Sequence, residues 1–326
     1  MSEERAPILV ANEARIAVDG VVALDRLTLS TSGDRVLFAG EVAALFGAIT
    51  QVPLSTRLGV GALAPVSKGR APVAPRDRDD EALEGEASVV AGSLRLAGRE
   101  VSEGAHVAIM GAAPLDPPLP PAWTAEEYVT WSARLAGASA REARALALTA
   151  LERVSLLPAR AKATSALPLP ERRALVLAQA IVMSPEVLVA ESPLEGLEGG
   201  AAAFVLQAIA AASNGRRALL SAARLDPGSA EGTLARSATT LIVLAGGAVA
   251  LEGTPAELFS GATIVSLTVS RNAEALRAEL SARGIVVRGG PSRFSAALPA
   301  GTGTREILLA AQATRAAVIE MVPVIG

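Results

Sequence analysis

The sequence predicts an α/β protein, in which a mixed sheet is flanked by helices and a smaller βαββαβ unit follows. Three patterns carry this prediction. An apolar strand at 35–39 ends at a glycine and leads into a predicted helix over 41–52. In the stretch 167–198, an Ala/Leu-rich helix precedes a short apolar strand, an acid and a proline turn. Residues 263–326 alternate short strands with two helices, which is the order of a ferredoxin-like unit.

Composition narrows the class of protein. A chain of 326 residues predicts about two domains. The sequence is 51% hydrophobic, but no run of about 18 residues lacks charges or turn formers, so no transmembrane helix is expected. The N-terminal apolar stretch is too short for a secretory signal, which favours a cytoplasmic chain. A net charge of −3 disfavours nucleic acid as a partner, and the absence of cysteine excludes disulfides and thiolate metal sites.

The first third of the chain predicts β-strands followed by a segment without regular secondary structure. Short runs between 8 and 38 alternate with turn residues and predict strands. Residues 53–86 are rich in Pro, Gly and clustered charges, which predicts a flexible, solvated insertion. Lys68 within it is a possible phosphate contact, although a solvated loop is the favoured interpretation.

The middle third predicts two helices after a stiff proline loop. A strand is expected at 106–110, with the single histidine, His106, at the surface or at the strand end. Thr124 and Glu127 have the spacing of a capping box at the start of a helix over 125–136. A second helix is expected over 139–154.

Three aromatic residues gather at the first of these helices: Trp123, Tyr128 and Trp131. Such a cluster predicts either a small local core or a docking patch for a partner protein, because aromatic side chains are enriched at interfaces. Further along, a helix over 200–213, a strand at 218–221 and a hairpin through Gly246-Gly247 complete the larger unit. No catalytic group is apparent in 263–326.

Six segments resemble the ATP-binding subunit of an ABC transporter in their order and spacing. They are VVALD (21–25), SLRLAGREV (93–101), DPPLPPAWTAEEY (116–128), RRALVLAQAIVMSPEVLV (172–189), SPLEGLE (192–198) and GGAVALEGTPAEL (246–258). The tail resembles the extra domain of ATPases that serve exporters of the ABC-2 type. The resemblance implies a P-loop NTPase-like ABC nucleotide-binding domain over 1–262, with a helical subdomain at 112–170, and a ferredoxin-like domain over 263–326.

The family's phosphate loop matches residues 40–50, GEVAALFGAIT. In that family, backbone N–H groups cradle the phosphate, a lysine neutralises its charge and a hydroxyl holds Mg²⁺. The resemblance places Gly40 at the start of the loop, Phe46 at the lysine and Gly47 at the serine. The stretch contains no lysine, and Phe46 is expected to crowd the phosphate space.

Other functional positions of the family are also altered. Leu115 stands at the γ-phosphate-sensing glutamine, Glu191 at the Mg²⁺-supporting aspartate, Ser192 at the catalytic glutamate and Ala223 at the switch histidine. The signature position reads Leu167, Pro168, Leu169, Pro170 and Glu171. Its two prolines suit a helix start but have no N–H to offer a phosphate.

The joint loss of these groups predicts weak or absent ATP and Mg²⁺ binding, because phosphoryl transfer depends on positioning and electrostatics. The resemblance then implies a degenerate, non-catalytic subunit (a pseudo-ATPase). It would be peripheral to the cytoplasmic face of a membrane and paired with a permease, an active ATPase chain or both, as a homo- or heterodimer. Two alternatives stay open: an active ATPase of an ABC-2 exporter, and a soluble sensor or binding module that uses the C-terminal domain.

Overall fold

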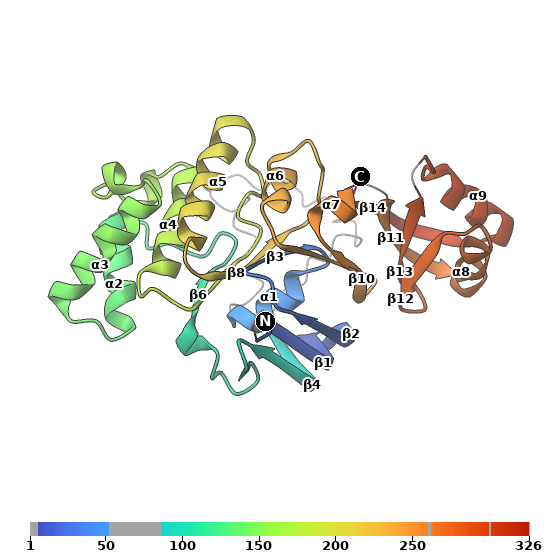
Figure 1. The fold of residues 1–326 in the computed structure, drawn as a ribbon, viewed down its shortest axis with the longest axis horizontal. Coiled ribbons are helices and arrows are strands. Elements are labelled where there is room, and N and C mark those ends of the chain that lie inside the picture. The colour runs from blue at the N-terminus through green and yellow to red at the C-terminus, as the bar shows by residue number, and fades with distance from the viewer. Residues whose placement is uncertain (1–5, 52–85, 260–261, 300, 326) are drawn as a thin grey trace, which may run out of the picture.

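The computed structural model describes residues 6–51, 86–259, 262–299 and 301–325 (Figure 1). The predicted insertion at 53–86, with Lys68, lies outside the described residues apart from Glu86. In the described part, the strands form three sheets. The central sheet lies between a helical lobe at one end of the molecule and the C-terminal unit at the other (Figure 1).

The first sheet is antiparallel, with the order β2-β1-β4-β5. Its strands are β1 (Leu9–Val18), β2 (Val21–Thr31), β4 (Ala87–Leu96) and β5 (Arg99–Glu100). The short runs expected between 8 and 31 therefore merge into two long strands, joined at Asp19-Gly20, where both residues have positive φ.

The central sheet has the order β10-β9-β3-β8-β7-β6 and is parallel except for the β9–β10 hairpin. Its strands are β3 (Arg35–Gly40), β6 (Met110–Ala113), β7 (Val187–Ala190), β8 (Arg217–Ala222), β9 (Thr240–Ala245) and β10 (Ala248–Gly253). Successive side chains of β3 enter two different cores, Phe38 on one face and Leu37 on the other. A strand buried on both faces reads as a continuous apolar run, which is why 35–39 was recognisable in the sequence.

Seven helices of the described part accompany these two sheets. They are α1 (Ala43–Thr50), α2 (Ala125–Leu135), α3 (Ala140–Arg153), α4 (Leu169–Ile181), α5 (Gly199–Ser213), α6 (Ala230–Arg236) and α7 (Pro255–Phe259). The capping box of Thr124 with Glu127 is confirmed, and Ser139 and Glu142 form a second one at α3. None of the helices in the described residues has the length and apolarity to cross a membrane.

The expectation for His106 was wrong. Residues Val107–Ile109 form a 3-10 helix, and the strand β6 begins only at Met110. The His106 ring is fully buried, with Nε2 2.7 Å from the carbonyl oxygen of Ile49 near the end of α1. A short apolar run does not by itself distinguish a strand from a helical turn, and the distant backbone partner left no local signal.

The C-terminal unit has the predicted βαββαβ order. Its elements are β11 (Ala262–Arg271), α8 (Ala273–Ala282), β12 (Val286–Gly289), β13 (Arg293–Pro299), α9 (Arg305–Thr314) and β14 (Ala317–Ile325). The antiparallel strand order β12-β13-β11-β14 is that of a ferredoxin-like sheet, and the two helices cover one face of it (Figure 1). The unit has its own core, but Ile264, Val324 and Ile325 pack into the core of the central sheet.

A candidate site at the carboxyl edge of the central sheet

The strand β3 ends at Gly40, the predicted start of the phosphate loop. Gly40 has φ +87°, and a Cβ at this position would collide with the carbonyl oxygen of Leu244 on β9. The amide of the next residue, Glu41, donates to the same carbonyl at 2.9 Å. Glycine is therefore required here by the close approach of two strands.

The helix α1 begins at Ala43, so only Glu41 and Val42 separate it from β3. Phe46 and Gly47 consequently lie in the body of the helix. The ring of Phe46 is fully buried and meets Phe38 edge to face, with 5.9 Å between ring centroids. The expectation that Phe46 crowds a phosphate space was wrong, because the early start of α1 turns this side chain into the core between two sheets.

The strand β7 delivers the acid Glu191 to the same edge of the sheet. Glu191 is 4% exposed, and its amide donates to the carbonyl oxygen of Ala113 at 2.9 Å. Ser192 follows with φ +39°, and its amide donates to the Ser221 hydroxyl at the end of β8, 2.9 Å away. These bonds fix the turn after β7 against its neighbouring strands.

A cavity of about 900 Å³ brings several of the predicted positions together. Gly40, Leu115, Glu191, Ser192 and Ala223 all line it. Phe46, Gly47 and the signature segment 167–171 do not. The β12–β13 turn of the C-terminal unit, residues 289–293, forms part of the cavity wall. The cavity is therefore shared between the central sheet and the C-terminal unit.

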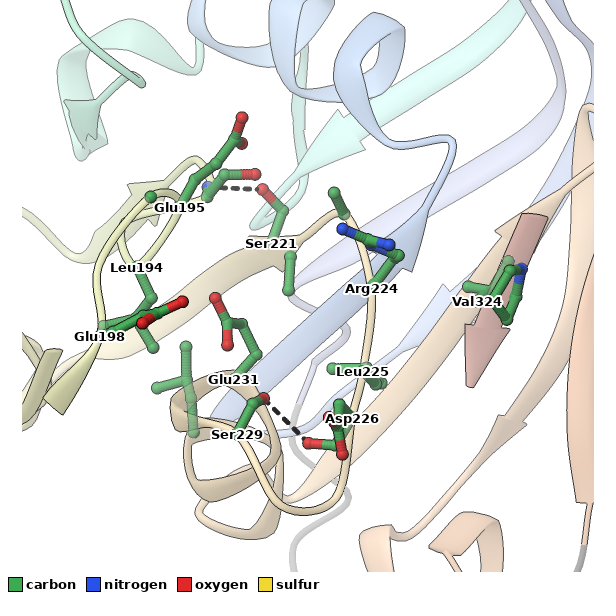
Figure 2. Close-up of a pocket in the computed structure, with 16 residues that line it drawn as sticks. Leu194, Glu195, Glu198, Ser221, Arg224, Leu225, Asp226, Ser229, Glu231 and Val324 are labelled. Carbon is green, nitrogen blue, oxygen red and sulfur yellow. Dashed lines mark hydrogen bonds between the residues drawn. The ribbon is translucent and has the colours of Figure 1, made fainter. Parts of the chain in front are cut away.

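A second cavity, of about 580 Å³, lies beside the turn after β7 (Figure 2). The acids that line it are Glu195, Glu198, Asp226 and Glu231, and Arg224 is a cation among them. Figure 2 shows Glu195 and Glu198 on one side and Val324, from β14, on the other. Although part of Glu195 reaches solvent, partial burial raises the pKa of its carboxyl. The backbone of β14 meets the segment that follows β8 here, because the Leu225 amide donates to the Val324 carbonyl at 2.8 Å.

The signature segment forms the N-terminus of α4, with Pro168 as the N-cap residue. The predicted role of its prolines in starting a helix is confirmed. Glu171 forms an ion pair with Lys162 at 3.2 Å. Two residues further, Arg173 lies almost fully buried and forms a bidentate pair with Asp116, at 2.9 and 3.2 Å.

The pair of Arg173 with Asp116 ties three segments together. The same guanidinium donates to the Glu195 carbonyl at 3.3 Å, so it joins α4, the loop before α2 and the turn after β7. Burial lowers the pKa of Arg173, whereas the Asp116 carboxylate opposes this shift. The role of Arg173 was not predictable from the sequence, because an arginine within an Ala/Leu-rich helix gives no local signal that it is buried.

The predicted aromatic cluster divides into two parts. Tyr128 packs against the main core. Trp123 and Trp131 meet edge to face outside it, with 5.9 Å between centroids, and Trp131 is 47% exposed. Arg134 lies over the Trp131 ring, 5.9 Å from its centroid. Local core and exposed patch therefore both occur within this cluster.

Comparison of this chain with known proteins identifies its fold. No family model matches the sequence, and no curated protein matches it. Solved structures do match. One is cbiO1 from Clostridium perfringens, part of the ABC transporter complex cbiONQ, with 16% identity, coverage of 78% of this chain and 92% of that chain, and a TM-score of 0.57. Another is MJ1267, an ATP-binding cassette of an ABC transporter, with 15% identity, coverage of 76% and 92%, and a TM-score of 0.55.

The chain has the fold of ABC transporter ATP-binding subunits. A nucleotide-free ATP-binding cassette from an ABC transporter matches similarly, with 14% identity, coverage of 76% and 92%, and a TM-score of 0.54. At these identities the likeness establishes the ABC-type fold alone. Within the described residues, no group of three or more His, Cys, Asp or Glu side chains is placed to hold a metal ion.

Proposed function

We propose that the chain is a non-catalytic subunit of ABC type, which pairs with a membrane permease, an active ATPase chain or both. The observation that carries this proposal is the start of α1 at Ala43. A phosphate loop needs a wide turn whose N–H groups surround the phosphate before the helix begins. The two residues between β3 and α1 are too few for such a turn.

The charges at the site also argue against Mg-ATP. The position of the loop lysine is occupied by Phe46, which is buried in the core. The residue after Gly40 is an acid, Glu41, and Glu191 lines the same cavity. Four carboxylates line the cavity, those of Asp25, Glu41, Glu191 and Glu195, against two arginines, Arg26 and Arg293, and no lysine. This balance disfavours a polyanionic ligand, because like charges repel in a partly desolvated site. Mg-ATP does not fit this donor set, and we assign no hydrolytic step to the chain.

A partner is expected because cbiO1, which shares the fold, is part of a transporter complex. We place the contact at the aromatic patch of Trp123 and Trp131, next to a groove of about 640 Å³. Glu126 holds two arginines at the rim of this groove, Arg144 at 2.8 Å and Arg160 at 3.7 Å. An exposed tryptophan with a stacked arginine has the composition of an interface anchor. The subunit would then lie at the cytoplasmic face of a membrane.

The experiment is affinity purification of the tagged chain from its own cells, without nucleotide, followed by mass measurement of the complex. We expect a stoichiometric complex with a permease or an ATPase chain. Trp131→Ala should weaken it at least tenfold. Leu308→Ala, which removes a comparably exposed apolar side chain on α9, should not. A chain that is recovered without any stoichiometric partner would contradict the proposal.

The competing function, an active ATPase of an exporter, makes a different prediction. It requires a vanadate-sensitive ATPase rate that Glu191→Gln abolishes. We expect no such rate for the chain alone. A rate measured with the purified complex should depend on the partner, so Glu191→Gln in this chain should leave it within about twofold.

A further inference from the structure

The carboxylate of Glu41 is held by donors from two parts of the molecule. The amides of Gly246 and Gly247 donate to it at 3.0 and 3.2 Å, and the Ser266 hydroxyl donates at 2.9 Å. The Arg293 guanidinium forms an ion pair with it at 3.2 Å. The Glu41 side chain is 18% exposed, whereas that of Arg293 is 52% exposed. The carboxylate is therefore mostly buried among its donors, and the guanidinium stays open to solvent.

The two amides are presented by a tight turn. Gly246 and Gly247 form the two-residue loop between β9 and β10, with φ +63° and +77°. Positive φ at both positions is typical of a type I′ turn, which glycine adopts without strain. A Cβ on Gly246 would lie 2.6 Å from the Cα of Phe294, so the close packing of the C-terminal unit also requires glycine there.

The donor set spans the seam between the central sheet and the C-terminal unit. Gly246 and Gly247 belong to the central sheet, whereas Ser266 lies on β11 and Arg293 starts β13. Other polar bonds also cross the seam: the Gly290 amide donates to the Gly246 carbonyl at 3.3 Å, Arg288 donates to the Ala250 carbonyl at 3.0 Å, and the Leu225 amide donates to the Val324 carbonyl at 2.8 Å. Glu41 is the acceptor on which both sides converge.

We propose that these four donors form an anion-binding site for a carboxylate or a phosphate group, and that Glu41 is its resident ligand. By filling the site, Glu41 latches the C-terminal unit over the larger cavity. Paired amides together with a guanidinium are the groups that proteins use to bind such anions. Glu41, Gly246, Gly247 and Arg293 all line the larger cavity, so a free anion can reach the donors once the carboxylate is removed.

This proposal goes beyond the proposed function and does not depend on it. A catalytic and a non-catalytic chain would both carry the latch, since none of its donors stands at a position that the resemblance assigns to phosphate, Mg²⁺ or water. The site is also distinct in chemistry from the predicted phosphate loop, because its amides come from the β9–β10 turn and not from the start of α1.

The test is anion rescue of Glu41→Ala in the full chain, followed by the thermal unfolding midpoint. We expect the variant to unfold about 4 °C below the wild type, because four donors lose their acceptor. Inorganic phosphate at about 20 mM should restore at least half of this loss, whereas chloride at equal ionic strength should not. Phosphate should not raise the unfolding midpoint more than chloride does in the wild type or in Glu103→Ala, which removes an exposed carboxylate elsewhere.

A midpoint equal to that of Glu103→Ala, or a loss that phosphate and chloride restore equally, would overturn the proposal. If Glu41→Ala does not fold, Glu41→Gln decides the matter, because it keeps the shape of the side chain and removes its charge. Amide hydrogen exchange at Gly246 and Gly247 should then be at least fivefold faster in Glu41→Gln than in wild type. Unchanged exchange at both amides would refute the latch.

Discussion

Replacing Phe46 with lysine introduces, at the aligned position, the residue that a phosphate loop uses. A restored ATP site would be expected if the side chain faced a phosphate. In this structure the Phe46 ring is fully buried against Phe38, so the substitution places an ammonium group in an apolar core. We therefore expect Phe46→Lys to destabilise the fold without creating ATP binding.

The size of the effect follows from two contributions. Truncation of a buried phenylalanine to alanine costs about 3–5 kcal/mol, of which the lysine stem recovers part. A buried lysine becomes neutral by losing its proton. The ordinary lysine pKa of about 10.4 lies roughly 3.4 units above pH 7, and each pKa unit costs about 1.36 kcal/mol, so deprotonation at pH 7 costs about 4.6 kcal/mol. A loss of about 6 kcal/mol is comparable with the roughly 5–15 kcal/mol that stabilises a typical protein.

The assay is urea unfolding of Phe46→Lys and of Phe46→Leu as a volume-matched control, at several pH values. The control should lose less than about 2 kcal/mol. Burial depresses the pKa of the new lysine below its unfolded value, so the unfolded state binds more protons. The stability of Phe46→Lys should therefore rise between pH 7 and pH 10, and that of Phe46→Leu should not. Wild-type stability together with Mg-ATP binding in Phe46→Lys would refute this account of α1.

Three further predictions concern stability. Arg173→Ala should lower the free energy of unfolding by about 3 kcal/mol, measured with urea, because it leaves Asp116 without its buried partner. Lys162→Ala, in an exposed ion pair, should lower it by less than about 1 kcal/mol. Equal losses would contradict the structural role of Arg173. Burial raises the folded-state pKa of Glu195, so the contribution of this carboxyl to stability is present in acid and is lost as pH rises through that pKa. Glu195→Gln should therefore raise the unfolding midpoint most near pH 7 and hardly at all at pH 4. A difference between the variant and the wild type that does not depend on pH would contradict the raised pKa. Thr124→Ala should cost about 1 kcal/mol through loss of the capping box, and an unchanged urea midpoint would show that the cap contributes nothing.

Much of the fold was predictable because its elements have strong local signals. The apolar strand 35–39 is buried on both faces, and the Thr124 capping box is complete within four residues. The βαββαβ order of the C-terminal unit followed from alternating strand and helix patterns, and its strand order confirmed the ferredoxin-like prediction. These features depend on residues that are close together in the chain.

The site was less predictable because its decisive contacts join distant residues. The motif comparison located Phe46 by counting from Gly40, but it did not show where α1 begins. A usable signal was present: Val42–Ile49 contains no polar side chain, which is typical of a buried helix and not of a phosphate loop. Glu41 meets Gly246 and Arg293 across more than 200 residues, and no local pattern announces such a contact.

The central claim, that the ABC-type fold is kept here without a working ATP site, is tested most directly by equilibrium titration of Mg-ATP into the purified chain. The measurement is made by calorimetry, with and without any co-purifying partner. We expect no saturable binding to this chain at ATP concentrations up to about 1 mM, which corresponds to less than about 4 kcal/mol of binding free energy. Stoichiometric binding in the micromolar range by the chain alone would contradict the account.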